Sequence, residues 1–437
     1  MREAAAIRVL AVSPRFAPTD GADTHRLRLL LPHAQGAGWS AEVLAVDPRD
    51  VPAPIDPALL RRLPQDLAVH RVRAWGLRGW GLNGLSQRAW RPLWRRGNEL
   101  LASRRFDLVF FSTTEFALHS LGAAWKRRFG IPFCMDFQDP WVNDYYRDHP
   151  DIVPPGGRLK YALADGLHRF LERRTVPACG GFMAVSERYI AALHERYGRD
   201  VAGKPCLVRP FPAEPAEART RSEATDAAPR RGEERTWRYI GRGGPDLKVA
   251  ASAFIEAWAA AVRLGAAGVD DVRFEALGTS YAQAGTGAKS LEPLAHATAV
   301  GSRITESTDR LPYGAAMQKL ADSDALVVFG SNDPAYTASK IYPYLLAGKP
   351  LLVIVHRDSP AVRVIDEVGG AVCVAFAGDE PVSDIAGRIR QAWFASGAST
   401  RVQPLNRQAL AAYTAERQAV EVREWMQAVL DAGGRHR

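Results

Sequence analysis

Short apolar runs alternate with longer amphipathic stretches along most of the chain. In the first half the runs are apolar at nearly every position, which is typical of strands covered on both faces. They predict strands at residues 7–12, 42–46, 67–72, 107–111, 132–137 and 181–185. The intervening stretches predict helices at 24–35, 116–129, 157–175 and 187–197. This alternation predicts an α/β fold with a parallel, doubly wound sheet.

The composition changes after residue 211. Segment 212–236 contains no aromatic residue and no Val, Ile or Leu, so it buries too little apolar surface to offset its ordering entropy, and it is predicted to be a flexible linker. Beyond it the alternation restarts, with a helix at 249–264 and strands at 238–240, 272–277, 325–329, 351–355 and 371–376. We therefore expect an N-terminal domain at 1–211, a C-terminal domain at 237–405, and a last helix, at about 406–430, that could pack back on the first domain.

Length and composition agree with two globular domains. The 437 residues are 47% hydrophobic and 24% charged, and the four cysteines show no CxxC spacing. No apolar stretch approaches the roughly 18 residues that a membrane-spanning helix needs, and the N-terminus has no export signal. These features predict a cytoplasmic protein.

The positive charge is concentrated in the first half of the chain. Residues 1–200 carry a net charge of +8 and the remainder +1. Segment 61–105 holds eleven arginines and four tryptophans but only two acidic residues. Arginine with tryptophan suits an anionic membrane surface, so 61–105 is a candidate for peripheral contact with the inner face of the cell membrane. An ordinary folded segment in an arginine-biased sequence is an equal alternative, whereas RNA binding lacks a recognisable module.

The segment 337–350 predicts a phosphate site. It lies between the apolar runs 325–329 and 351–355, and Thr337 or Ser339 can cap a helix that Gly348-Lys349-Pro350 ends. A helix start at the carboxyl end of a parallel strand is a favoured place for phosphate.

A second glycine turn points to the same chemistry. Gly241-Arg242-Gly243-Gly244-Pro245-Asp246-Leu247-Lys248 follows the first strand of the second half and opens its first helix. Its glycines allow backbone amides to approach a ligand, and Arg242 and Lys248 can each meet a phosphate. The GxxxxGK[ST] and GxGxxG spacings are absent here, which argues against NTPases, kinases and ordinary dehydrogenases.

Together these motifs resemble those of GT-B glycosyltransferases, most closely the retaining family 4. The resemblance rests on Gly241-Arg242 with Lys248 and on Ser339-Lys340-Ile341-Tyr342 leading to Ala347-Gly348-Lys349-Pro350. In the first half, segments 107–112, 130–141 and 184–187 are similar to strand-ending motifs of that family. The resemblance implies two Rossmann-like, doubly wound domains facing each other across a cleft.

It also implies a function. A transferase of the hexosyltransferase type would move a sugar from a nucleotide-diphosphate sugar to a glycan, glycolipid or similar acceptor in polysaccharide biosynthesis. Anomeric configuration would be retained, and neither a metal nor another cofactor would be needed. Nucleic acid is not an expected partner.

The resemblance further suggests roles for individual residues. Asp139 is the candidate catalytic carboxylate, with a structural carboxylate capping the next turn as the alternative. Donor-binding candidates are Gly21, Arg242, Lys248, Ser339, Lys340 and, for the ribose, Glu367. His25 and Gln138 are candidates on the acceptor side, although His25 also fits a plain helix-surface residue.

The sequence departs from the family pattern at several positions. Where family 4 enzymes carry two glutamates, this chain has Ala335 and Pro343, and Gln138 replaces the histidine of a His-Asp pair. Besides the transferase, two hypotheses remain open: a catalytically inactive GT-B binding protein and a sugar-nucleotide epimerase.

Overall fold

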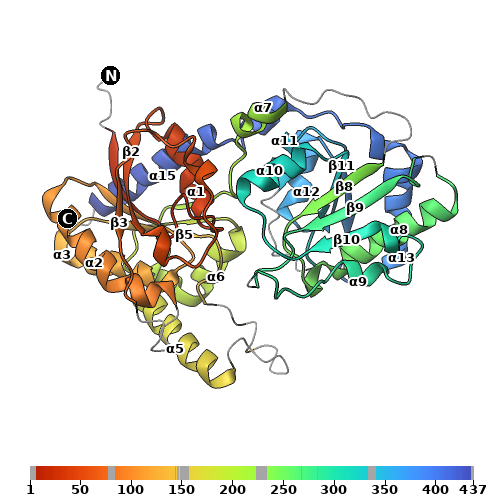
Figure 1. The fold of residues 1–437 in the computed structure, drawn as a ribbon. Coiled ribbons are helices and arrows are strands. Elements are labelled where there is room, and N and C mark those ends of the chain that lie inside the picture. Colours follow the sequence, from red (N-terminus) through yellow and green to blue (C-terminus); the bar gives the residue numbers. More distant parts are fainter. Residues whose placement is uncertain are drawn as a thin grey trace. The chain divides into compact units, whose positions relative to one another are not determined.

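The computed structural model divides the chain into two compact α/β units (Figure 1). The first comprises Met1–Pro212 together with Ala415–Arg437, and the second comprises Ala213–Thr414. The structure describes residues 6–76, 84–142, 144, 147, 157–222, 234–266, 268–282, 284–332 and 341–434.

The first unit is built on a parallel sheet of seven strands in the order β3-β2-β1-β4-β5-β6-β7. The strands are β1 (Ile7–Val12), β2 (Trp39–Val46), β3 (Val69–Val72), β4 (Leu108–Ser112), β5 (Phe133–Phe137), β6 (Gly181–Ala184) and β7 (Cys206–Val208). The central strands β4 and β5 are buried at every position. The six predicted strands are thus confirmed within a few residues. The three-residue β7 is too short to leave a pattern.

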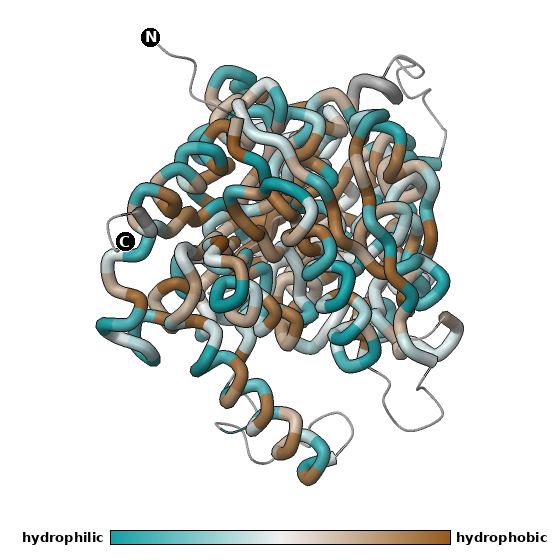
Figure 2. The backbone as a smooth tube through the Cα atoms, turned by 90° about the vertical axis from the view of Figure 1, so that its left-hand side faces the viewer, coloured by the Kyte–Doolittle hydropathy of each residue, from teal (hydrophilic) through white to brown (hydrophobic). Residues whose placement is uncertain are grey.

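Helices cover both faces of this sheet. They are α1 (Thr24–Ala34), α2 (Leu85–Ser103), α3 (Ser120–Phe129), α5 (Arg158–Thr175), α6 (Glu187–Tyr197) and α15 (Ala415–Gly434). Successive side chains of a strand point to opposite faces. Phe110 accordingly meets Trp425 of α15 edge-on at 5.8 Å, whereas Phe111 stacks on Trp125 of α3 at 5.9 Å. Helix α5 extends away from the sheet of its own unit (Figure 1), and apolar and polar positions alternate along it (Figure 2).

The helix predicted at 406–430 is two helices that belong to different units. The short α14 (Arg407–Ala411) stays in the second unit, and α15 packs against α1 in the first. The Asn406 side chain accepts hydrogen bonds from the backbone N–H groups of Gln408 and Ala409, at 3.1 and 3.0 Å, and so fixes the start of α14. The buried Trp39 indole donates to the carbonyl oxygen of Ala419 at 3.1 Å, which fixes α15 on the first sheet.

The second unit contains a parallel sheet of six strands in the order β10-β9-β8-β11-β12-β13. The strands are β8 (Arg235–Ile240), β9 (Val272–Leu277), β10 (Ile304–Ser307), β11 (Ala325–Phe329), β12 (Leu351–His356) and β13 (Val372–Phe376). The helices are α7 (Pro215–Ser222), α8 (Lys248–Arg263), α9 (Glu292–Ala295), α10 (Tyr313–Ala321), α11 (Ile341–Leu346), α12 (Pro360–Val368), α13 (Val382–Ile389) and α14. All strands predicted in this half are confirmed, and β10 is additional.

Part of the predicted linker 212–236 is ordered. Helix α7 lies within it, because its Ala, Glu and Arg residues favour a helix even without apolar side chains, and the Glu214 side chain accepts a hydrogen bond from Ala216 N at 3.2 Å. Strand β8 begins at Arg235, inside the same segment. Residues 223–233 lie outside the described residues.

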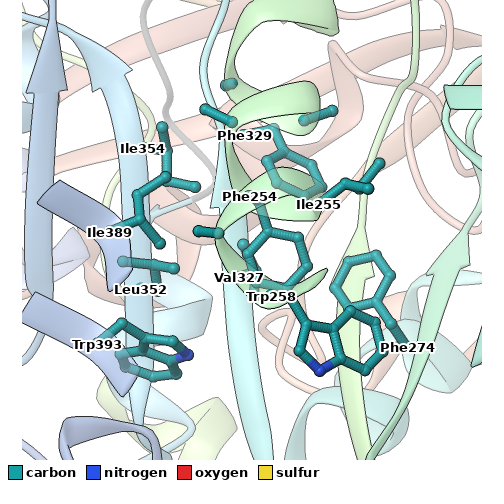
Figure 3. Packing of buried hydrophobic residues seen from close by; sticks show 14 of the residues in the cluster. Phe254, Ile255, Trp258, Phe274, Val327, Phe329, Leu352, Ile354, Ile389 and Trp393 are labelled. Carbon is teal, nitrogen blue, oxygen red and sulfur yellow. The ribbon is translucent and has the colours of Figure 1, made fainter. Parts of the chain in front are cut away.

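Aromatic side chains dominate the core of the second unit (Figure 3). Phe254 and Trp258 project from α8 onto the sheet, where Phe254 lies 5.1 Å from Phe274 and 5.7 Å from Phe329, measured between ring centroids. Trp393 closes the opposite side of the cluster. Because α8 is held by this much buried surface, the position of its first residue is well defined.

Part of the arginine-rich segment 61–105 has a structural role. Arg88 is buried in α2, and its guanidinium donates to the carbonyl oxygens of Asp50 at 2.9 Å and Trp75 at 3.4 Å. Trp90 and Trp94 stack on each other and pack against the core. Arg88, Trp90 and Trp94 therefore serve packing within the first unit. Other members of the segment, such as Trp75, Arg91 and Arg95, are exposed, so membrane contact through 61–105 stays a prediction. Residues 77–83 lie outside the described residues. Within the described chain, no helix combines the length and apolarity required to cross a bilayer.

Candidate functional site

Each sheet has one point at which the strand order reverses. In the first unit it lies between β1 and β4, and in the second between β8 and β11. Segments leaving neighbouring strands diverge at such a point, and doubly wound sheets bind ligands at the carboxyl edge there. The segments after β1, β4 and β5 in the first unit, and after β8 and β11 in the second, therefore lie at the edge where each sheet is expected to bind a ligand.

The glycine turn after β8 forms a tight approach to α8. Gly241 N donates to the carbonyl oxygen of Leu277 at 3.0 Å, and Gly243 N donates to that of Thr279 at 2.7 Å, so the turn continues alongside β9. Gly244 has φ of 142°, a conformation that side chains disfavour. Lys248 is the exposed first residue of α8, at the positive end of the helix dipole.

An ion pair shapes this turn. Arg242 donates to both carboxylate oxygens of Asp246, at 2.8 and 2.6 Å. Burial disfavours ionisation of Asp246, but hydrogen bonds from Arg242 and Ser331 outweigh it and lower the pKa of Asp246. The carbonyl oxygen of Asp246 also accepts from Asn332 N at 2.9 Å. Asp246 therefore joins the turn after β8 to the segment after β11, across the point of strand reversal.

The predicted phosphate segment is described only in part. Ser339 and Lys340, with Thr337 and Ala335, lie outside the described residues. The helix that follows them, α11, is fixed at the same edge, because the Tyr344 hydroxyl accepts from Ile240 N at 2.6 Å and donates to Ile240 O at 2.9 Å. Pro343 lies in α11, and its side chain has no polar atom.

Glu367 is not brought to this edge. Helix α12 starts after the carboxyl end of β12 and runs back toward the amino end of β13, and Glu367 lies near its C-terminus. Its carboxylate accepts a hydrogen bond from the Tyr413 hydroxyl. A helix that connects parallel strands reverses the direction of the chain, which is why Glu367 lies at the opposite edge of the sheet.

A buried glutamate beside the turn had not been predicted. Glu306 of β10 accepts hydrogen bonds from three backbone N–H groups, those of Ser290, Leu291 and Glu292, at 2.8–3.0 Å, and one from the Thr279 hydroxyl at 2.6 Å. It thereby holds Ser290, whose hydroxyl accepts from Gly244 N at 3.2 Å. In the sequence, the one sign of this role is that an acidic residue, Glu306, stands at a strand position whose side chain points into the unit.

In the first unit, Asp139 follows β5 at the carboxyl edge and is exposed. Partial desolvation, and the nearby negative charge of Asp23, raise the pKa of Asp139. Asp23 is itself buried and accepts from the Thr113 hydroxyl at 2.9 Å and from Thr114 N at 3.2 Å. The segments after β1, β4 and β5 thus converge around two carboxylates.

Arg15 partly compensates this negative charge. It forms an ion pair with Glu115, lies 3.6 Å from Asp23, and donates to the Thr114 hydroxyl at 3.0 Å. Arg15 lies shortly after the first strand and Glu115 shortly after the fourth, and this placement of charged residues at strand ends is the signal by which the sequence could have indicated them.

Gly21 and His25 lie in and just after the turn between β1 and α1. Gly21 N donates to the Thr24 hydroxyl at 3.3 Å, and an added Cβ at Gly21 would come within 3.0 Å of Asp23. His25, in the first turn of α1, lies 3.2 Å from Asp20, and its Nδ1 accepts from Arg28 at 3.3 Å. Both residues therefore lie at the same edge as Asp139.

Gln138 is turned inward. It is buried, and its side-chain nitrogen donates to the Ser112 hydroxyl at 3.0 Å and to Asp136 at 2.8 Å. The structure thus places the Gln138 side chain in a buried network with Ser112 and Asp136, and its role on the acceptor side stays a prediction. Among the residues that the structure describes, no cluster of His, Cys, Asp and Glu has the arrangement of a metal site.

Comparison with known proteins identifies the architecture. No family model and no curated protein sequence matches the chain. Among solved structures, HepE from Anabaena in complex with UDP-glucose matches with 14% identity over 98% of each chain and a TM-score of 0.53. A UDP-forming α,α-trehalose-phosphate synthase from Burkholderia vietnamiensis matches with 13% identity over 98% of this chain and 97% of that one, at a TM-score of 0.54. The chain has the GT-B fold.

A third match is to a protein described as an enzyme of another class, so these likenesses define the fold and not the reaction. A putative UDP-N-acetylglucosamine 2-epimerase from Listeria monocytogenes shares 12% identity over 97% of each chain, with a TM-score of 0.50. At these identities the comparison defines the GT-B fold, with its two Rossmann-like units, and the assignment to family 4 stays a prediction.

Proposed function

We propose that this GT-B protein is a glycosyltransferase that moves a sugar from a nucleotide-diphosphate donor to a glycan, glycolipid or similar acceptor. The observation that carries the proposal is the edge of the second sheet at β8 and β11. There Gly244, Arg242 and Lys248 surround the positive end of α8. Such an edge suits a diphosphate, which needs cations and oriented amides to neutralise it.

In this proposal the second unit binds the donor. Lys248 forms no ion pair within the described chain, and it binds one phosphate of the donor. Arg242 releases Asp246, its present ion-pair partner, and binds the second phosphate. Ser339 and Lys340 add further donors. These groups also stabilise the nucleoside diphosphate as it leaves, a role that requires no metal ion.

The first unit supplies the acceptor side. Asp139 stabilises positive charge at the anomeric carbon, and the anomeric configuration is retained. In the segment after β1, His25 lies on the acceptor side, and Gly21 contacts the donor phosphate. The reaction belongs to polysaccharide or glycolipid assembly in the cytoplasm, where nucleotide sugars and lipid-linked acceptors meet.

Donor binding is the first test. Thermal unfolding is measured with UDP, GDP, ADP and the corresponding nucleosides. One diphosphate should raise the Tm while its nucleoside does not. Lys248→Ala should weaken that binding by about tenfold, since one charge-assisted phosphate contact is lost. The matched control is Lys319→Ala, an exposed lysine near the C-terminus of α10, at the other edge of the sheet. Absence of a Tm shift with every diphosphate would contradict the proposal.

A catalytically inactive GT-B binding protein is the second candidate function. Pro343 favours it, because this position cannot hydrogen-bond a ribose through its side chain, and so does the inward-facing Gln138. Release of nucleoside diphosphate from a bound nucleotide sugar separates the candidates. A transferase releases it in the presence of an acceptor, an inactive protein binds without release, and an epimerase interconverts the sugar with no acceptor present.

A further inference from the structure

Helix α5 exposes a continuous apolar face, defined by Leu159, Leu163, Leu167 and Phe170. These side chains are 77%, 70%, 49% and 51% exposed, respectively. Spacings of four, four and three residues place all of them on one side of a helix. They are four of the ten large hydrophobic side chains that are exposed in the described part of the chain. The α5 apolar face therefore needs an explanation other than packing within its own unit.

The basic residues of α5 border this face. Lys160, Arg173 and Arg174 are all exposed. Lys160 precedes Leu163 by three positions, and Arg173 follows Phe170 by three, so each lies next to the apolar side chains. The Arg174 guanidinium lies over the Phe170 ring, 4.3 Å from its centroid. The apolar face thus carries cations at both of its margins.

The acidic residues of α5 point the other way. Asp165 pairs with Arg169 at 2.8 Å. Glu172 is buried, where it pairs with Arg196 at 2.7 Å and accepts from the Tyr197 hydroxyl at 2.9 Å. The exposed side of the helix is therefore apolar and cationic, with no carboxylate to repel an anionic surface.

We propose that the α5 apolar face docks on an anionic lipid membrane. Leucine and phenylalanine would enter the boundary between headgroups and acyl chains, and the flanking cations would meet lipid phosphates. A second copy of this chain fits less well, because a symmetric α5–α5 contact would bring the cations Lys160, Arg173 and Arg174 of one copy close to those of the other. The proposal moves membrane contact from segment 61–105 to α5, and it is independent of donor binding.

The test is flotation of the purified protein with vesicles. Vesicles of phosphatidylcholine mixed with phosphatidylglycerol should bind it, and pure phosphatidylcholine vesicles should bind much less. High salt should weaken the binding. Leu159→Ser combined with Leu163→Ser should lower the partition coefficient by more than about tenfold, because two leucines no longer enter the bilayer. Lys160→Glu combined with Arg173→Glu should lower it similarly for anionic vesicles only.

The matched control, Arg91→Glu combined with Arg95→Glu, reverses the charge of two exposed arginines of α2. It should bind vesicles as the unchanged protein does. Loss of binding in this control, or full binding by both α5 variants, overturns the proposal. A dimer that the leucine variant dissociates in sedimentation velocity also overturns it, since a second copy would then cover α5. Urea unfolding checks that each variant folds, and Leu159→Ser alone serves if the double variant does not. A donor-induced Tm shift that stays unchanged in the α5 variants separates this result from the proposed function.

Discussion

Arg26 of α1 and Asp136 of β5 form an ion pair that is wholly shielded from solvent, with 3.2 Å between Nε and Oδ2. The same guanidinium donates to the carbonyl oxygens of Arg209 and Pro210, at 2.9 and 2.7 Å, and lies over the Phe211 ring. Burial lowers the pKa of Arg26, and the charge of Asp136 opposes that shift. Arg26 therefore holds the segment that follows β7, residues 209–211, against the sheet of the first unit.

Removal of one member of this pair should be costly. Asp136→Ala leaves a buried arginine without its counter-ion and should lower the free energy of unfolding by about 3–5 kcal/mol in urea titrations. The exposed Asp66→Ala should change it by less than about 0.5 kcal/mol. Arg26→Met combined with Asp136→Leu should recover much of the loss. Equal stability of Asp136→Ala and Asp66→Ala would show that the pair is not structural.

His119 should make stability depend on pH. The imidazole is completely buried among Phe111, Phe116 and Trp141, and neither ring nitrogen has a hydrogen-bond partner within the described chain. Burial lowers the pKa of His119 to about 3. The unfolded chain therefore binds one more proton between about pH 3 and the usual histidine pKa of about 6.5. The stability due to a neutral His119 is complete above that range and falls as the pH is lowered, by about 1.4 kcal/mol per unit.

The variant His119→Leu removes both the titration and two unsatisfied nitrogens. It should be at least as stable as the unchanged protein at pH 7 and should lose less stability on acidification to pH 5, in urea titrations at each pH. The same acid sensitivity in His119→Leu would assign the effect to other groups.

Glu306 should determine the order of the segment beside Gly244. Glu306→Ala leaves three backbone N–H groups without their acceptor and should lower the unfolding free energy by about 3 kcal/mol, whereas Glu256→Ala on the exposed side of α8 should be nearly neutral. Hydrogen exchange should accelerate at Ser290, Leu291 and Glu292. Unchanged exchange at these amides would contradict the assigned role.

Substitution by alanine should have opposite effects on stability at two glycines in helix interiors. At Gly97 of α2 a Cβ would lie 2.1 Å from the Trp125 ring, so Gly97→Ala should destabilise by about 1–3 kcal/mol through overpacking. At Gly166 of α5 a Cβ meets nothing within 4 Å, and Gly166→Ala should stabilise by up to about 1 kcal/mol through helix propensity. Thermal unfolding of both variants measures the contrast, and a shared sign would refute it.

Asp139→Asn tests the proposed chemistry. If Asp139 stabilises the transition state, kcat should fall on the order of 100-fold while nucleoside diphosphate affinity stays the same. Because the pKa of Asp139 is raised, activity that requires its carboxylate should already decline with acidity at a pH above the usual carboxyl pKa of about 4. If kcat is unchanged in Asp139→Asn, Asp139 does not take part in catalysis, and its role is structural.

The sequence predicted the architecture more completely than the site. Strands such as β11 are apolar throughout, so their positions can be read without knowledge of neighbours, whereas β10 alternates buried and exposed residues over only four positions. The turn at Gly241–Lys248 was recognisable because its glycines and cations are local features. The inward orientation of Gln138 depends on a hydrogen bond to Ser112 of a different strand, which local sequence does not encode. Glu367 lies at the opposite edge because α12 runs back from β12 toward β13.

The assignment of α15 to the first unit bears on biosynthesis. The ribosome completes the whole second unit before it makes α15, yet α15 supplies the acceptor for Trp39 Nε1 and the aromatic partner Trp425 of Phe110. During translation one apolar face of the first sheet stays incompletely covered until about two hundred further residues have been synthesised. Completion of the first unit therefore has to follow synthesis of the second, although most of the first unit is made before it.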